Sequence, residues 1–398
     1  MKLPNIILFD DPEIRGNLLP FTFSRPVAEI RIGILTIREK WQSATGEAAS
    51  VLTEAYLSKK FPLKTAAVNL LINASVLPDD DLLKEISSLK EGDCLLKDDA
   101  LIATVGKGAD AKNMFSKGRK KKYSKGLLQV THLWDIFRLN EKAIIADFSL
   151  LTKKRKSQPL DKSNHLSGNN IFIEKGAKVS CSILNSETGP IYIGKDAEVM
   201  EGSLIRGPFA LCEYSTLKMG AKIYGATTIG PHCKVGGEIN NSVLFGYSNK
   251  AHDGFLGNSV IGEWCNIGAD SNNSNLKNNY TSVKLWHYPT ASFVDTGLQF
   301  AGLFMGDHSK CGINTMFNTG TVVGFSANIF GSGFPRNFIP SFSWGGAHGF
   351  STYSLEKAKE TGERMMERRN LKMDAVEKEI WKNIFELTEQ YRKKMGLE

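Results

Sequence analysis

The histidine at position 252 lies in the sequence context that most favours chemistry. It stands in the segment Ser248-Asn-Lys-Ala-His-Asp-Gly-Phe-Leu-Gly257. An imidazole gains and loses a proton near neutral pH, so it can act as a general base in a transfer reaction. We therefore predict a catalytic role for His252. The competing interpretation is a packed structural histidine, which is the commoner role of a lone histidine.

The segment around His252 interrupts a six-residue repeat. Neither a helix, with its period of 3.6, nor a strand, with its period of 2, produces such a spacing. Short strands joined by tight turns do, with one inward aliphatic side chain per side and about 18 residues in each three-sided coil. We therefore predict a left-handed parallel β-helix. Eight aliphatic residues at consecutive sixth positions carry the pattern: Ile193, Val199, Ile205, Leu211, Leu217, Ile223, Ile229 and Val235.

The repeat continues less regularly beyond His252. The spacing returns at Phe255, Ile261 and Ile267, and it is then absent until Met305. Loops that leave a rigid scaffold tend to carry function. The interruption therefore predicts a functional loop, which we expect to fold back over His252.

The sequence divides into three predicted regions. An α/β domain is expected over residues 1–160, the β-helix over 161–335 and a C-terminal helical arm over 336–398. Within the first region, apolar runs predict strands at 5–9 and 67–73 with a helical stretch at 35–58 between them. In the last region, Asp374 and Glu377 have the spacing of a capping box, which predicts a helix start.

Composition excludes several classes of protein. No apolar stretch approaches the ~20 residues that span a bilayer. The short apolar run at the N-terminus predicts a buried strand and not a signal peptide. The six scattered cysteines indicate reduced thiols in a cytoplasmic protein, with no metal site. The net charge of +8 favours phosphorylated small molecules as ligands. The basic runs at 117–125 and 153–156 carry no known nucleic-acid motif, so we expect solvated loops or a phosphate-binding loop there and no nucleic-acid partner. Without a spanning stretch we expect no membrane partner either.

Residues 238–280 resemble a bifunctional bacterial family, the N-acetylglucosamine-1-phosphate uridyltransferase/glucosamine-1-phosphate acetyltransferases. The likeness rests on Lys250-Ala-His-Asp-Gly-Phe-Leu-Gly257, on Ile261-Gly-Glu-Trp-Cys-Asn-Ile-Gly-Ala269 and on Ser274-Asn-Leu-Lys-Asn278. The resemblance gives His252 the place of the family's catalytic base and Asn275 that of its loop asparagine. It also implies acetyl-CoA as a substrate and a homotrimer that builds its coenzyme A sites between neighbouring subunits.

Four further positions depart from the family pattern. Phe255 replaces a tyrosine, Asn240 replaces a lysine that contacts the sugar phosphate, and Lys218 takes the place of an arginine. Lys250 stands one residue closer to the histidine than the family's lysine does. The resemblance therefore implies that Lys218, Asn240, Lys250, Phe255 and Asn275 line the substrate site, and it leaves the acceptor sugar open.

The N-terminal region resembles the nucleotidyltransferase part of the family only weakly. The segment Leu8-Phe-Asp-Asp-Pro-Glu-Ile-Arg15 lacks the glycines that let backbone amides approach a triphosphate, although Arg15 keeps the place of the family's arginine. Arg25 and Arg31 could replace lost phosphate-binding cations, because guanidinium groups bind phosphate well. They could equally be ordinary ion-paired residues. Magnesium is expected only if this region is active.

These observations favour acyl transfer from acetyl-CoA to a sugar phosphate or nucleotide sugar, with His252 as general base. Two alternatives remain open. One is a sugar-1-phosphate nucleotidyltransferase that uses the N-terminal region, and the other is a non-catalytic protein that binds a nucleotide sugar.

Overall fold

The computed structural model describes residues 3–397, which divide into two compact units. The first unit runs to Leu18, resumes at Ser24–Ile30 and continues over Leu35–His132. The second unit takes Leu19–Phe23, Arg31–Ile34 and the chain from Leu133 onward. Two short segments from the N-terminal region therefore belong to the second unit.

The first unit is built on a six-stranded sheet in the order β2-β1-β3-β5-β4-β6. The central strand β1 is flanked by parallel neighbours β2 and β3, and β5 runs antiparallel to β3. Four of the five residues of β1 are buried, as its apolar sequence predicts. The strands are β1 (Asn5–Phe9), β2 (Ala49–Leu52), β3 (Asn69–Asn73), β4 (Asp93–Lys97), β5 (Ala100–Gly106) and β6 (Arg119–Lys122).

The helices of this unit are short, and one prediction about them is wrong. The expected helical stretch 35–58 holds only for α2, because Gly46 adopts a left-handed backbone with φ of 73° and ends that helix. The chain then forms β2, which pairs with β1. The helices are α1 (Pro12–Asn17), α2 (Ile37–Thr45), α3 (Asp80–Ser87) and α4 (Ala111–Lys117).

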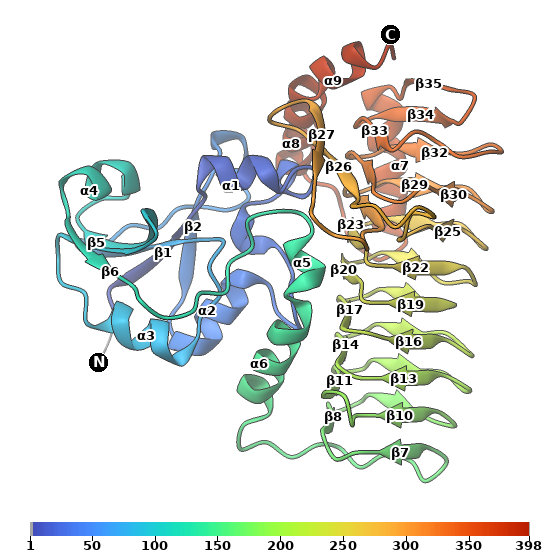
Figure 1. Cartoon of the computed structure of the whole chain (residues 1–398), viewed down its shortest axis with the longest axis horizontal. Coiled ribbons are helices and arrows are strands. Elements are labelled where there is room, and N and C mark those ends of the chain that lie inside the picture. Colours follow the sequence, from blue (N-terminus) through green and yellow to red (C-terminus); the bar gives the residue numbers. More distant parts are fainter. Residues whose placement is uncertain (1–2, 398) are drawn as a thin grey trace. The chain divides into compact units, whose positions relative to one another are not determined.

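The second unit contains a parallel β-helix, which confirms the fold class (Figure 1). Each coil crosses three faces, which we name after their first strands. The β7 face has β7 (His165–Ser167), β10 (Ile183–Asn185), β13 (Leu204–Arg206), β16 (Lys222–Tyr224), β19 (Glu238–Asn240) and β22 (Phe255–Gly257). Beyond β22, the short strands β25 (Asn272–Asn273) and β30 (Met316–Phe317) pair with each other.

The other two faces are longer. The β8 face has β8 (Ile171–Ile173), β11 (Ile191–Ile193), β14 (Phe209–Leu211), β17 (Thr227–Ile229), β20 (Val243–Gly246), β23 (Val260–Glu263), β28 (Leu303–Met305), β31 (Thr321–Val323) and β33 (Phe338–Ile339). The β9 face has β9 (Lys178–Val179), β12 (Glu198–Val199), β15 (Thr216–Leu217), β18 (Lys234–Val235), β21 (Asn249–Lys250), β24 (Asn266–Ile267), β29 (Lys310–Cys311), β32 (Asn328–Ile329), β34 (Ser343–Gly346) and β35 (Gly349–Thr352).

The core of the β-helix follows the six-residue repeat. All eight aliphatic residues from Ile193 to Val235 are at most 2% exposed, which confirms the prediction. One later position is corrected: Leu256, at 2% exposed, pairs with Ile239 and points inward, whereas its neighbour Phe255 is half-buried. The inward position of this coil therefore lies one residue later than the six-residue spacing predicts.

The segment that breaks the repeat does not fold over His252. It leaves the coil after β25, forms the hairpin β26 (Lys284–His287) and β27 (Ser292–Asp295), and returns at β28. The Trp286 ring stacks on Phe338 of the β8 face at 4.0 Å, and Tyr288 packs against both Phe338 and Tyr391. Aromatic packing therefore holds the hairpin against Phe338 and Tyr391. The expectation that this segment folds back over His252 is wrong.

Helices complete the second unit along the faces of the β-helix and against its last coils. Asp374 caps α8 by accepting a hydrogen bond from the Glu377 amide at 2.8 Å, as its spacing predicts. Trp381 of α8 is fully buried and packs against Phe325 at 4.8 Å, so α8 covers the last coils. The helices are α5 (Asp135–Arg138), α6 (Asn140–Thr152), α7 (Leu355–Glu367), α8 (Ala375–Leu387) and α9 (Glu389–Lys394). No helix of the described chain is long and apolar enough to span a bilayer.

Candidate functional site

His252 lies in the turn between β21 and β22, where the chain passes from the β9 face to the β7 face. Its side chain is exposed, so it is available to a ligand. The turn is fixed from several sides. The Asp270 amide donates to the Asp253 carbonyl at 3.0 Å, and the Phe255 amide donates to Asn272 Oδ1 at 2.8 Å. The structure thus presents an imidazole on a well-anchored corner.

Lys250 supports this turn from inside the core. It pairs with Val235 and occupies an inward position that aliphatic residues fill in neighbouring coils. Its side chain is 1% exposed, and its ammonium donates to the carbonyls of Gly236 at 3.3 Å, His252 at 2.5 Å and Asp253 at 3.0 Å. Burial lowers the pKa of the ammonium to about 8. Lys250 is therefore placed to hold the backbone of the turn and not to reach a ligand.

His252 stands between two neighbouring cavities. One, of about 500 Å³, opens onto the β9 face and is lined in part by Lys234, Asn249, Asn266, Arg368 and Arg369. The other, of about 460 Å³, follows the corner toward the β7 face and includes Lys218, Met219, Asp253 and Asp270. His252 lines both cavities, and its side chain is exposed.

The predicted site residues separate into two groups. Lys218 shares the second cavity with His252. Asn240, Phe255 and Asn275 gather instead around Gly257: a β-carbon there would lie 2.5 Å from Phe255 Cζ and 2.8 Å from Asn275 Nδ2. Gly257 also pairs with Asn240 across β19 and β22. Since Gly257 ends β22 and His252 precedes its start, the strand separates the two groups.

Sequence reasoning missed three basic residues of the first cavity. Arg368 and Arg369 follow the last turn of α7, and Lys234 projects from β18. Arg369 Nη2 donates to Asn249 Oδ1 at 3.3 Å, which ties the end of α7 to the β9 face. The pair of adjacent arginines was visible in the sequence, but no pattern placed it more than a hundred residues back along the chain, beside His252.

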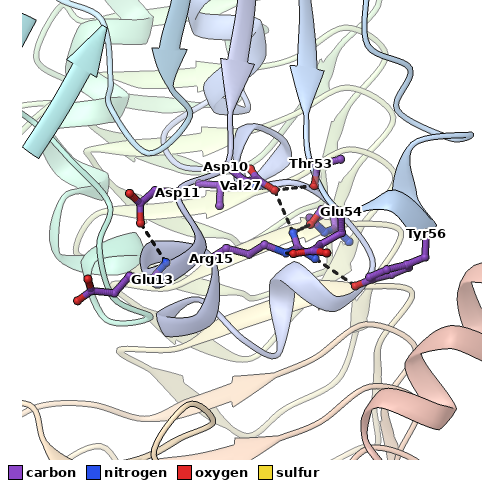
Figure 2. Close-up of polar contacts among 9 residues, drawn as sticks. Asp10, Asp11, Glu13, Arg15, Val27, Thr53, Glu54 and Tyr56 are labelled. Atoms are coloured by element: carbon purple, nitrogen blue, oxygen red, sulfur yellow. Dashed lines mark hydrogen bonds and ion pairs between the residues drawn. The ribbon is translucent and has the colours of Figure 1, made fainter. Parts of the chain in front are cut away.

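Arg15, the predicted phosphate ligand of the first unit, is engaged within the protein (Figure 2). Its guanidinium is 3.1 Å from Asp10 Oδ2 and donates to the Tyr56 hydroxyl at 3.1 Å and to the Arg25 carbonyl at 3.1 Å. Asp10 also accepts from Thr53 at 2.6 Å. The local role of Arg15 is to pair with a buried carboxylate.

The other two predicted arginines are also buried. Arg25 lies in the first unit and is 6% exposed, and its charge is close enough to lower the pKa of the Glu29 carboxyl, which burial raises overall. Arg31 lies in the second unit, is 8% exposed and donates from Nε to the Phe245 carbonyl at 3.1 Å. Arg31 therefore ties its segment to β20.

The first unit has a cavity of about 700 Å³ at the carboxyl end of β1, beside Phe9. Open α/β sheets bind nucleotides at such strand ends. Among the described residues its polar lining is mostly acidic, with Asp10, Asp11, Asp99 and Asp110 against one lysine, Lys112. Within residues 3–397 no group of three or more His, Cys, Asp or Glu side chains is placed to hold a metal ion.

Comparison with known proteins identifies one family match. Residues 6–156 match the family model described as sugar nucleotidyl transferase. No curated protein matches the chain.

Solved structures with a related arrangement include two UDP-N-acetylglucosamine acyltransferases. The one from Francisella novicida is 10% identical, with 58% of this chain and 76% of that chain covered and a TM-score of 0.29. The one from Arabidopsis is 15% identical, with 60% and 92% covered and a TM-score of 0.22. A third is AntD, an N-acyltransferase from Bacillus cereus in complex with dTDP and 3-hydroxybutyryl-CoA, at 13% identity, 51% and 91% coverage and a TM-score of 0.23. The family match by itself supports, in broad terms, a transferase of sugar-nucleotide chemistry.

Proposed function

We propose that the β-helix transfers an acyl group, most simply acetyl from acetyl-CoA, to an amino group of a sugar phosphate or nucleotide sugar. One observation carries this proposal: His252, whose side chain is exposed, lines two cavities at once, on a turn that buried Lys250 holds in place. A transfer between two substrates needs such an arrangement, with the proton acceptor between the donor and acceptor sites.

The reaction balances with His252 as the only protein base. The acceptor nitrogen attacks the thioester carbonyl carbon and forms a C–N bond, while the imidazole takes the proton from that nitrogen. The C–S bond then breaks, the sulfur leaves with the electron pair, and the imidazolium returns the proton to it. The products are an amide and free coenzyme A, and the scheme uses no protein nucleophile. Lys218 is a candidate ligand for the acceptor, because it lines the second cavity.

The resemblance assigns the remaining candidate residues to the acceptor as well. Asn240, Phe255 and Asn275 would contact it at the far end of β22, and Lys250 would act by positioning the turn. Their separation from His252 along one strand suits an extended acceptor such as a nucleotide sugar.

A cyclic trimer is part of the proposal. Met219 and Ile313 are 71% and 70% exposed, and each lines one of the two cavities beside His252. Large exposed apolar side chains next to a site are typical of an interface. A neighbouring subunit that covers them would close the cavities and complete a coenzyme A site. We place this assembly in the cytoplasm, where reduced cysteines persist.

The test is acyl transfer by His252→Ala. Coenzyme A release from acetyl-CoA is followed with a thiol reagent, against a panel of amino-sugar phosphates and UDP- and dTDP-linked amino sugars. We expect a fall of ~10²–10⁴-fold with little change in the melting temperature, because the side chain is exposed. His165→Ala is the matched control, since His165 is exposed on β7, the edge strand of its face, several coils away from His252.

Two results would count against this function. A His252→Ala protein that loses stability but keeps its rate per folded molecule would make His252 structural. Absence of coenzyme A release by the wild-type protein with every acceptor, together with tight binding of a nucleotide sugar, would favour the non-catalytic alternative.

Nucleotidyl transfer by the first unit is the second candidate, and the family match over residues 6–156 favours it. The acidic lining of the cavity near β1 and the pairing of Arg15 with Asp10 weigh against triphosphate binding there. Magnesium bound together with the nucleotide would be needed to offset that charge.

A further inference from the structure

The first cavity beside His252 has an unusual charge balance. Lys234, Arg368 and Arg369 line it, and among residues 3–397 no aspartate or glutamate does. The second cavity, on the other side of His252, contains Asp253 and Asp270 against one cation, Lys218. The two sides of the candidate catalytic histidine therefore differ in sign, although both open at the same corner of the β-helix.

The three cations of the first cavity form no ion pair in the part of the chain that the structure describes. Elsewhere this chain pairs such groups, as Arg155 with Glu174 at 2.6 Å. Like charges gathered without a counter-ion repel one another, and a bound anion removes that cost.

The geometry also holds part of this charge in place. The bond from Arg369 to Asn249 Oδ1 fixes one guanidinium against the β9 face. Burial lowers the pKa of the nearby His232 imidazole; the Glu213 carboxylate opposes this shift, and the Arg369 charge adds to it. Asn266 adds an amide to the same wall. Guanidinium and amide donors on a fixed surface are suited to phosphate oxygens.

We propose that this cavity is a phosphate-binding subsite, in which Lys234, Arg368 and Arg369 hold a phosphate or diphosphate group of the ligand that reacts at His252. The inference rests on the proposed acyl transfer for the identity of the ligand, but not for the binding of the anion. Two ligands carry the required chemistry, the diphosphate and 3′-phosphate of coenzyme A and the diphosphate of a nucleotide sugar.

The first experiment measures pyrophosphate binding to the whole protein by titration calorimetry at low ionic strength. We expect binding by the wild-type protein, and at least tenfold weaker binding when Arg368→Gln and Arg369→Gln are combined, because each charged hydrogen bond is worth about a factor of ten or more. Arg364→Gln is the matched control: Arg364 lies in the last turn of α7, just before the two arginines, pairs with Glu360 at 3.8 Å and is not among the residues that line the cavity.

A second variant tests whether the double variant loses affinity only because the end of α7 no longer packs on the β9 face. Lys234→Gln alters the β-helix side of the cavity and leaves the bond between Arg369 and Asn249 intact. It should also weaken pyrophosphate binding, with an unchanged melting temperature. Equal pyrophosphate affinity in wild type, the double variant and Lys234→Gln would overturn the subsite, and so would an equal loss in Arg364→Gln.

The source of the phosphate is decided with acetyl-CoA, acetyl-dephospho-CoA and UDP-N-acetylglucosamine. A selective loss of acetyl-CoA affinity in the double variant assigns the subsite to coenzyme A, and a selective loss of UDP-N-acetylglucosamine affinity assigns it to the acceptor. Unchanged affinity for all three would overturn the proposal. His252→Ala separates this inference from the function, because it should leave pyrophosphate affinity unchanged even if it abolishes acyl transfer.

Discussion

The buried lysine at position 250 makes the stability of this protein depend on pH in a way that can be calculated. Burial lowers its pKa from 10.5 to about 8 in the folded state. A folded-state pKa below the unfolded value means that the unfolded chain binds the proton more tightly at alkaline pH. Stability from this group therefore increases as pH rises from about 8 toward 10.5, and below pH 8 the full penalty of burying the charge is present.

The size of the effect follows from the shift. At ~1.4 kcal/mol per pKa unit, the penalty below pH 8 is about 3 kcal/mol, and about 2 kcal/mol of it disappears between pH 7 and pH 9.5. Lys250→Met keeps a similar length and removes the charge, so the variant should lack this pH dependence. The free energy of unfolding of Lys250→Met at any one pH also reflects the carbonyls that lose their hydrogen-bond donor. The informative quantity is therefore the change of the free energy of unfolding with pH.

The assay is urea unfolding of both proteins from pH 7 to pH 9.5. The wild-type free energy of unfolding should rise by about 2 kcal/mol relative to Lys250→Met over that range. Lys310, whose pKa burial also lowers to about 8, is present in both proteins and cancels in the difference. A difference between the two proteins that stays flat with pH would refute the burial of a charged Lys250.

Three other predictions concern different parts of the chain. The first unit should release little or no pyrophosphate from UTP or dTTP with hexose-1-phosphates and magnesium, and turnover near ~10 s⁻¹ would promote the nucleotidyltransferase hypothesis. Sedimentation equilibrium should show a cyclic trimer, whereas a monomer at micromolar concentration would remove the shared coenzyme A site. Leu256→Ala should cost ~2–5 kcal/mol in chemical denaturation because Leu256 is 2% exposed, and half-buried Phe255→Ala should cost about 1 kcal/mol; the reverse order would contradict the corrected repeat.

The sequence by itself determined the architecture of the β-helix. Each inward residue lies a fixed number of positions along the chain from the next. A local period of six therefore predicts directly which residues form the core between successive coils. The first strand, Asn5–Phe9, could also be predicted from the sequence, because its apolar run forms an interior strand of the sheet. The start of α8 at Asp374 followed from capping chemistry, which involves neighbouring residues alone.

Tertiary structure decided the position of Lys250. Leu217 and its partner Val235 are 18 residues apart, but Val235 and Lys250 are only 15 apart and Asn249 and Asn266 are 17 apart. Turns at the corners absorb these differences without disturbing the strand pairing. A period counted along the chain therefore could not show that Lys250 points inward or that Leu256, and not Phe255, does.

Tertiary structure also decided the composition of the candidate site. Arg368 and Arg369 reach the cavity beside His252 because α7 returns along the β9 face, and that packing depends on contacts between residues more than a hundred positions apart. Asn275, close to His252 in sequence, is held at the other end of β22. Sequence spacing predicts which residues lie close together only within one repeating element. Between elements, the path of the chain decides which residues meet at the site.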